Sequence, residues 1–146
     1  MSPFASKLKA YDLHLLYGFG YDQSTDDYLV VLLSYDQTLT NRSVSHLELF
    51  SLRDNTWNQI GDPHLTYFNA APIVKVGSFF NGAFHWVARR NDLSVDVIVF
   101  DLMERKLLEM PLPDDFDNSA LSYGLWVFGE SLSLWSMDFR NRRVEI

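Results

Sequence analysis

The sequence predicts an all-β fold, built as a partial β-propeller of consecutive antiparallel hairpins. Apolar and polar residues alternate with a period of two, turn residues recur about every eight to twelve positions, and no segment shows sustained helical periodicity. One stretch is also copied, because Val95–Pro113 follows the plan of His46–Pro63, fifty positions upstream. A self-match at a period of roughly forty to fifty residues is typical of propeller blades. The aligned pairs are Phe50 with Phe100, Leu52 with Leu102, Asp54 with Glu104, Trp57 with Leu107, Ile60 with Met110 and Pro63 with Pro113.

The first predicted hairpin follows an irregular N-terminal segment, residues 1–10. Its first strand combines Tyr11–Leu16 with Tyr17–Tyr21, where aromatic residues alternate with glycines that allow a close approach by a neighbour. Asp22–Asp27 is a turn by composition, since carboxylates and hydroxyls bond the local backbone. Tyr28–Ser34 is rich in β-branched and aromatic residues and predicts a buried strand.

The second predicted hairpin joins Val44–Ser51 to Trp57–Ile60 through the polar turn Arg53–Thr56. A further strand is expected at Ala71–Val76. Asn81-Gly82 then supplies the positive φ angles of a type I′ turn, which predicts a hairpin of Ile73–Phe80 with Ala83–Arg89.

The remaining hairpins complete the repeat. Val95–Leu102 pairs with Lys106–Met110, and Pro111–Asn118 is expected to be a loop because its two prolines cannot sit inside a sheet. Leu121–Phe128 and Ser131–Met137 repeat the plan of Ile73–Ala88, and Val144–Ile146 begins another strand. Three hairpins carry an apolar pair seven residues apart, expected where the last two strands of a blade meet the next blade: Tyr21 with Tyr28, Phe50 with Trp57, and Phe100 with Leu107.

Composition limits the function classes. The net charge of −7 opposes non-specific attraction to phosphate backbones, so nucleic acid is not an expected partner. The absence of cysteine excludes a disulfide framework and fits a reducing compartment, and no apolar run reaches the length of a signal peptide or a membrane span. A cytoplasmic or nuclear location and no membrane association are therefore expected.

Motifs for catalysis and metal binding are missing. The four histidines have no metal-ligand spacing, and the acidic run at 114–118 lacks the glycine and glutamate of a calcium loop. His85 is interpreted as a hydrogen-bonded, partly buried residue, facing the opposite side from Trp86. No nucleophile elbow or dinucleotide motif occurs, so we expect no catalytic residue, cofactor or metal. Carboxylate pairs for glycoside hydrolysis stay open, because their separation is spatial.

Four motifs, in order and at consistent spacing, resemble the type 1 F-box-associated domain of plant F-box/kelch-repeat proteins. They are YGFGYDQSTDDYLVV, LELFSLRDNTWNQI, VGSFFNGAFHWVA and VIVFDLMERKLLEMPLP, and they lie between Tyr17 and Trp135. The resemblance implies a kelch-like propeller, no enzymatic activity, and a role as the substrate-recognition region of an SCF-type ubiquitin ligase. Its partner would be the protein to be ubiquitinated.

The chain departs from the family pattern at both ends. No F-box precedes Tyr11 and the strands expected after Val144 are missing, so the β domain at residues 11–146 is expected to be truncated. A Skp-type adaptor would bind only a longer form that carries an F-box. Two alternatives remain open: a truncated, non-functional paralogue, and a propeller-based enzyme that acts on glycans.

Loop placement suggests where a target would bind. Propellers bind partners through their connecting loops, here expected at 35–43, 61–69, 89–94 and 111–118. Aromatic residues and arginine dominate binding hot spots, so they mark the candidates in these loops. The candidate partner-binding residues are Tyr35, Tyr67, Phe68, Arg89, Arg90 and Phe116.

Overall fold

The computed structural model describes residues 13–36, 45–61, 67–68, 75–90, 94–116, 122–138 and 143–145. Within these ranges the chain forms strands and turns, with no helix. The predicted all-β fold is therefore confirmed, while the segment at 1–10 lies outside the described residues. The strands are β1 (Leu13–Asp22), β2 (Asp27–Asp36), β3 (Ser45–Ser51), β4 (Thr56–Gln59), β5 (Tyr67–Phe68), β6 (Lys75–Val76), β7 (Ser78–Phe80), β8 (Ala83–Arg90), β9 (Val95–Asp101), β10 (Lys106–Pro111), β11 (Ser122–Phe128), β12 (Ser131–Asp138) and β13 (Arg143–Glu145).

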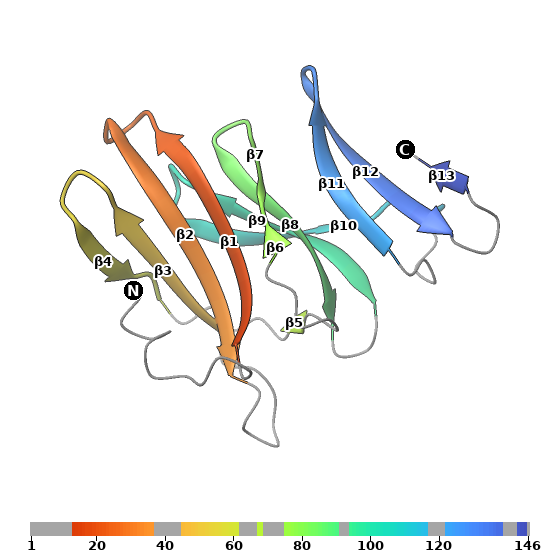
Figure 1. Ribbon diagram of the computed structural model, residues 1–146, viewed down its shortest axis with the longest axis horizontal. Helices are drawn as coiled ribbons and strands as arrows, with labels where there is room; N and C mark the ends of the chain where they lie inside the picture. Colours follow the sequence, from red (N-terminus) through yellow and green to blue (C-terminus); the bar gives the residue numbers. More distant parts are fainter. Residues whose placement is uncertain are drawn as a thin grey trace.

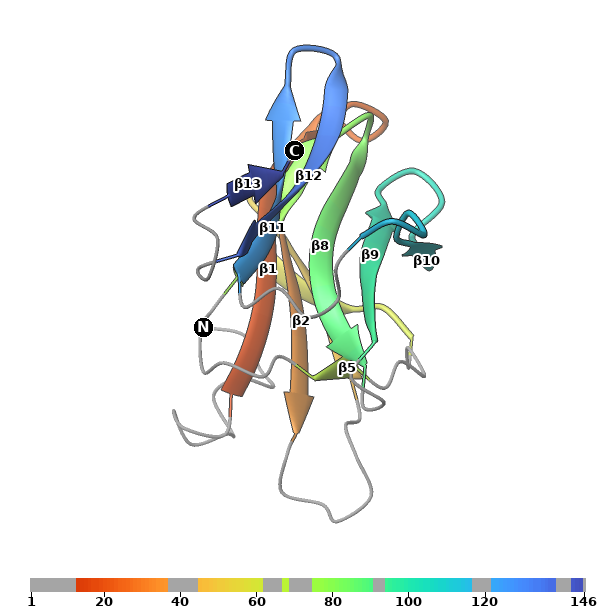
Figure 2. The ribbon, with the colours of Figure 1, turned by 90° about the vertical axis from the view of Figure 1, so that its right-hand side faces the viewer.

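These strands make three sheets that follow one another along the molecule (Figure 1). The first sheet has the order β4-β3-β2-β1-β6, the second β10-β9-β8-β5 with β7 also paired to β8, and the third β11-β12-β13. Within the runs β1–β4, β7–β10 and β11–β13, each strand pairs antiparallel with the next along the chain, as predicted. The view turned by 90° shows the long strands of the sheets running in similar directions (Figure 2).

The three predicted apolar pairs lie directly opposite one another across their hairpins. Tyr21 faces Tyr28, Phe50 faces Trp57, and Phe100 faces Leu107. The ring centroids are 5.1 Å apart in both aromatic pairs, within the range of favourable ring contacts. One part of the prediction is wrong. Tyr21 and Tyr28 join β1 and β2, which come first along the chain in their sheet, rather than the later hairpin β3–β4.

The hairpin turns repeat a backbone conformation. The turns after β1, β3 and β9 each end on a residue with positive φ: Asp26 (52°), Asn55 (52°) and Arg105 (53°). Asn81 and Gly82 both have positive φ, 50° and 73°, which confirms the predicted type I′ turn.

The segment before this turn corrects the prediction of one long strand from Ile73 to Phe80. Lys75–Val76 (β6) belongs to the first sheet, where it pairs in parallel with β1, and the hairpin with β8 begins only at Ser78. Gly77 separates the two short strands, and a Cβ there would lie 2.5 Å from Nε1 of Trp86. The chain therefore crosses the edge of the Trp86 indole where only glycine fits.

The boundary at Pro111 also differs from the prediction. Pro111 is the last residue of β10 and pairs with Asp96, although the sequence places it in a loop. β10 is the edge strand of its sheet, where a residue without an N–H is tolerated.

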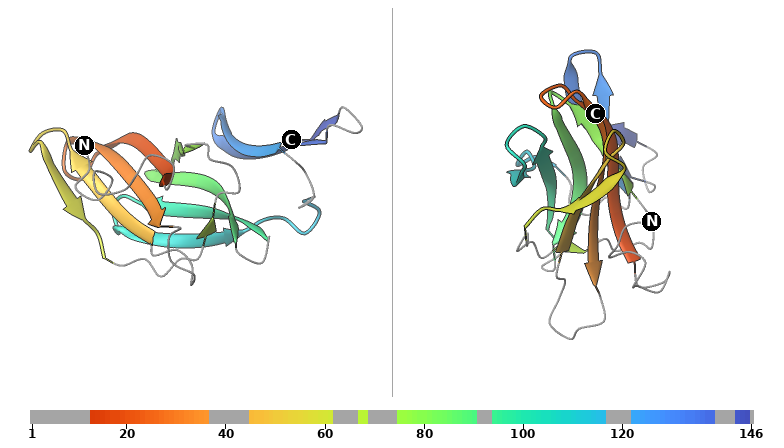
Figure 3. Two further views of the ribbon diagram at one scale, coloured as in Figure 1. Left: turned by 60° about the horizontal axis from the view of Figure 1, so that its bottom comes forward. Right: turned by 90° about the vertical axis from the view of Figure 1, so that its left-hand side faces the viewer.

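The main core lies between the first and second sheets, which stack on each other in Figure 3. Phe84, Trp86, Ile98 and Phe100 of the second sheet are buried against five leucines and Val31 of the first. A smaller cluster joins the second and third sheets: Val87, Val95 and Val97, with Val99, Leu112, Tyr123, Leu125 and Leu134 packed against them.

Candidate functional site

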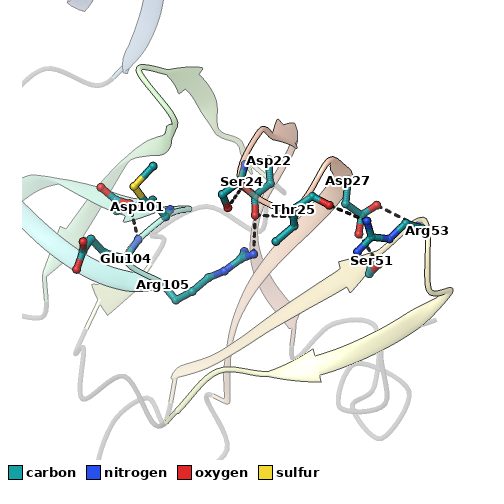
Figure 4. A network of polar contacts seen from close by, with 10 residues as sticks. Asp22, Ser24, Thr25, Asp27, Ser51, Arg53, Asp101, Glu104 and Arg105 are labelled. Carbon is teal, nitrogen blue, oxygen red and sulfur yellow. Dashed lines mark hydrogen bonds and ion pairs between the residues drawn. The ribbon is translucent and has the colours of Figure 1, made fainter.

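Four hairpin turns from the first two sheets meet at one end of the molecule. They occupy residues 22–27, 51–56, 81–82 and 101–106, and we call them the turn cluster. The backbone links them in pairs: Leu52 N–H donates to the Tyr28 carbonyl at 3.0 Å, and Leu102 N–H donates to the Gly82 carbonyl at 3.1 Å. Side chains complete the connection across the two sheets (Figure 4).

Asp22 is the hub of this cluster. One carboxylate oxygen accepts hydrogen bonds from the Ser24 N–H at 3.0 Å and the Ser24 hydroxyl at 2.6 Å. The other accepts from the Thr25 hydroxyl at 2.9 Å and from Nη2 of Arg105, in the second sheet, at 2.6 Å. Burial alone would raise the pKa of Asp22, but the hydrogen bonds and the guanidinium outweigh it, so the pKa is lowered.

Asp27 ties the two hairpins of the first sheet together. Its carboxylate accepts a hydrogen bond from the Ser51 hydroxyl and another from the Arg53 N–H, the latter at 3.0 Å. The Ser51 bond is the main reason that the pKa of Asp27 is lowered. Arg53 Nη1 in turn donates to the Thr25 carbonyl at 2.7 Å. The buried carboxylates of the cluster therefore hold turns in place.

Three exposed apolar side chains, Tyr21, Phe79 and Met103, lie in or beside the turn cluster. A pocket of about 300 Å³, which we call the turn pocket, opens between the turns of the two sheets. Met103 at its rim is 75% exposed, and Tyr21 donates its hydroxyl to Asp26 at 2.5 Å, which raises the Tyr21 pKa. Its lining is Tyr21, Asp22, Gln23, Ser24, Phe79, Gly82, Leu102 and Met103.

A second pocket of about 300 Å³, the sheet pocket, lies between the second and third sheets. Burial lowers the pKa of His85, so the imidazole is neutral at pH 7, and its Nδ1 lies 3.4 Å from the Ser78 carbonyl oxygen. His85 is therefore hydrogen-bonded as interpreted, while Trp86 donates its Nε1–H to the Tyr17 carbonyl at 3.0 Å. The lining includes no carboxylate: Val76, Ser78, His85, Trp86, Val87, Tyr123, Gly124, Leu125 and Trp135.

Five of the six predicted partner-binding residues lie in strands rather than loops. Tyr35 is in β2. Tyr67 and Phe68 form β5 and pair with Arg90 and Arg89 of β8, so these four positions, drawn from two predicted loops, are adjacent on one strand pair. Phe116 follows β10, where its N–H donates to the Pro113 carbonyl at 3.0 Å and its ring meets Tyr123 edge-on.

Sequence reasoning missed the turn pocket. Its residues come from three separate hairpins, and none of them was a candidate. One signal was available, because Leu102 and Met103 place two apolar side chains in a turn that is otherwise charged. The copied turn at 52–55 has a single apolar residue, Leu52.

Among the residues that the structure describes, no group of three or more His, Asp or Glu side chains is arranged to hold a metal ion. The same residues include no helix with the length and apolarity needed to cross a bilayer.

Comparison with known proteins places the chain in a family. The family described as the F-box associated beta propeller domain matches residues 5–146. An F-box/kelch-repeat protein of Arabidopsis thaliana is 32% identical over 103 residues, 66% of this chain and 26% of that protein. A second Arabidopsis thaliana protein, also named as an F-box protein, is 25% identical over 118 residues, 77% of this chain and 31% of its own length. The chain thus spans about a quarter to a third of these relatives, and no solved structure matches it.

Proposed function

Since the chain belongs to the F-box associated beta propeller domain family, we propose that it is the substrate-recognition region of an SCF-type ubiquitin ligase receptor. Its partner is the protein to be ubiquitinated, and it acts by binding rather than by catalysis. A Skp-type adaptor takes part only through an F-box, in a longer form of the protein. The place of action is the cytoplasm or the nucleus.

The turn pocket is the observation that carries the binding role. Its exposed apolar side chains, Tyr21, Phe79 and Met103, are aromatic or sulfur-containing, the kinds that contribute most to protein interfaces. The hydrogen bonds of Asp22 and Asp27 hold the surrounding turns rigid, so little conformational entropy is lost when a partner binds. A rigid pocket with these apolar side chains, beside the polar Gln23 and Ser24, suits an apolar side chain of the target.

The positions Tyr67, Phe68, Arg89 and Arg90 form a second candidate surface, at the β5–β8 pairing. Tyr35 and Phe116 remain predictions of the same kind. Because these positions and the turn pocket involve different residues, separate variants distinguish the two surfaces.

The test is quantitative affinity capture of the whole chain and its variants from plant cells in which the proteasome is inhibited. Met103→Lys places a charge at the rim of the turn pocket without touching the core. Leu108→Lys is the matched control, since Leu108 is also exposed but lies on β10 outside the pocket. We expect ubiquitinated proteins captured by the native chain to be lost from Met103→Lys and kept by Leu108→Lys.

Two results would contradict the proposal. Equal capture by both variants would remove the turn pocket from the binding surface, and Tyr67→Ala with Phe68→Ala would then test the second one. Captured proteins that are not ubiquitinated when the domain is part of a longer form with an F-box would remove the ligase role itself.

A further inference from the structure

The turn pocket lies among carboxylates that are bonded to the residues lining it. Asp22 belongs to the lining itself. Asp26 accepts a hydrogen bond from the Tyr21 hydroxyl at 2.5 Å, and Asp101 accepts one from the Met103 N–H at 2.8 Å. Tyr21 and Met103 are two of the exposed apolar side chains of the pocket, so each of these residues is hydrogen-bonded directly to a carboxylate.

The donors that bind two of these carboxylates are neutral. Asp101 accepts the N–H groups of Met103 and Glu104, both at 2.8 Å, and Asp26 accepts the Tyr21 hydroxyl. A neutral donor orients a carboxylate but does not cancel its charge. Asp22 differs, because Nη2 of Arg105 pairs with it at 2.6 Å.

The turn cluster as a whole carries excess negative charge. Its six carboxylates and three cations give a net charge of −3: Asp22, Asp26, Asp27, Asp54, Asp101 and Glu104 against Arg53, Arg105 and Lys106. Each cation lies within 4 Å of a carboxylate of the same cluster, and Figure 4 shows Arg105 reaching Asp22. The excess charge therefore disfavours an acidic partner and favours a basic one.

Tyr21 reports this negative charge at the wall of the pocket. The pKa of Tyr21 is raised, chiefly because its hydroxyl donates to Asp26, and the charges of Asp26 and Asp22 add to the rise. Negative charge opposes the anionic phenolate for the same reason that it attracts a cation. The wall at Tyr21 thus favours a positive group over a negative one.

The size of the turn pocket suits one large side chain. Its volume of about 300 Å³ is at the lower end of the range for ligand pockets, about 300–1,000 Å³. Phe79 and Met103 come from different hairpins and are 36% and 75% exposed, so both are open to apolar contact. Gln23 and Ser24 are exposed beside them, so polar groups next to an inserted side chain stay solvated.

We propose that the turn pocket receives an apolar side chain from a segment of the target that is rich in lysine or arginine. The apolar side chain enters the pocket, and the flanking cations lie beside the carboxylates of Asp26 and Asp101. The proposal rests on the function proposed above and adds the chemistry of the recognised segment. A basic segment is also attracted from a distance, since the whole chain has a net charge of −7.

Synthetic peptides of equal length, each with an uncharged fluorophore, test this preference on the whole chain. Three carry a central phenylalanine flanked by lysines, by serines or by glutamates, and a further peptide carries a central serine flanked by lysines. Fluorescence anisotropy measures their affinities. We expect the phenylalanine peptide flanked by lysines to bind about ten times more tightly than each of the others.

Three results of this comparison would overturn the proposal. Equal affinity for the three phenylalanine peptides would show that charge is not recognised. Equal affinity for the two lysine peptides would show attraction by charge alone, without an apolar side chain in the pocket. Lack of binding by every peptide, up to millimolar concentration, would show that a segment of this kind is not recognised.

Asp26→Asn removes one charge and keeps the local structure. Asp26 has a φ of 52°, a left-handed conformation that asparagine also adopts, and the amide oxygen of asparagine can accept the Tyr21 hydroxyl. Asp115→Asn is the matched control, because Asp115 is exposed, follows β10 and does not line the pocket. Circular dichroism checks that both variants keep the β-structure.

We expect Asp26→Asn to weaken binding of the phenylalanine peptide flanked by lysines by about two- to threefold. The decline of affinity with added salt should also become less steep, because fewer charges take part. Asp115→Asn is expected to leave the affinity and the salt dependence unchanged. Equal effects of the two variants would overturn the placement of the cations beside the pocket.

Met103→Lys separates this proposal from the function on which it rests. If this variant loses the ubiquitinated targets in cells, while the native chain binds lysine-flanked and glutamate-flanked peptides equally, the pocket binds targets and the proposed charge preference is wrong. If capture in cells is unchanged, while peptide binding depends on Met103 and Asp26, the charge preference is right and the pocket does not capture the targets.

Discussion

At the scale of single residues, the carboxylates of the turn cluster serve mainly to hold the backbone of the hairpin turns in place. Asp22 and Asp101 each begin a hairpin turn and accept hydrogen bonds from N–H groups two or three residues later. Asp22 also reaches Arg105 in the next sheet. A carboxylate in such a position satisfies backbone donors that the turn leaves without partners.

The lowered pKa of Asp22 predicts that stability falls in acid. The folded state holds the proton less tightly than the unfolded state, whose pKa is near 3.8. The stabilisation is therefore present above that value and is lost as the pH falls through the lower, folded pKa. Asp22→Asn should lower the free energy of unfolding at pH 7 by about 1–2 kcal/mol. The variant should also lose less stability than the native protein between pH 7 and pH 3, as measured by urea unfolding at both pH values.

Asp54→Asn provides the matched control. Its partner Arg53 lies 3.7 Å away and both side chains are more than half exposed, so the change should stay within about 0.5 kcal/mol. An Asp22→Asn variant as stable as Asp54→Asn, with an unchanged response to acid, would show that the Asp22 carboxylate contributes nothing to the free energy of unfolding.

At the scale of elements, β1 explains why glycine alternates with aromatic residues. Gly18 and Gly20 share the inner face of β1, and Phe19 and Tyr21 share the outer face. A Cβ on Gly18 would lie 2.4 Å from Cδ1 of Phe84, and one on Gly20 would lie 2.8 Å from Cζ of the same ring. The absence of two side chains in β1 thus makes room for one ring of the second sheet.

Gly18→Ala should therefore destabilise the protein by overpacking, by about 1–3 kcal/mol in thermal or urea unfolding. Phe84→Leu removes the ring atoms that the new methyl group meets, so the double variant should be more stable than the sum of the single effects. Additive effects within about 0.5 kcal/mol would contradict the contact.

At the scale of the whole molecule, stability comes from stacking sheet on sheet. The same hairpin is core in the second sheet and surface in the first, because only the second has a sheet packed over its apolar side chains in the described part of the chain. Burial thus depends on the position of a sheet in the stack and not on its sequence. The family to which the chain belongs identifies this stack of sheets as a β-propeller domain.

A pair of substitutions at repeat-equivalent positions measures the effect. Leu102→Ala should cost about 2–4 kcal/mol, because it leaves a cavity in the core. Leu52→Ala should change the free energy of unfolding by no more than about 0.5 kcal/mol, since Leu52 is on the surface. Urea unfolding followed by fluorescence compares the two variants, and equal costs would contradict the burial difference.

The sequence by itself determined the class of the fold, the hairpins and the family. Alternation and turn residues are local signals, and each of the pairs Phe50 with Trp57 and Phe100 with Leu107 lies across a single hairpin. Both pairs could therefore be predicted from the sequence. The NG turn followed from the φ angles that those two residues accept.

Only the tertiary structure decided where the chain leaves a sheet and which apolar side chains stay in solvent. Lys75–Val76 joins the first sheet and Tyr67–Phe68 the second through contacts with distant strands, which local patterns do not encode. The turn pocket likewise needs three hairpins at one end of the stack. Burial depends on neighbours in space. Leu52 and Leu102 therefore occupy the same place in the repeat but differ in exposure, because only Leu102 has a sheet packed over it.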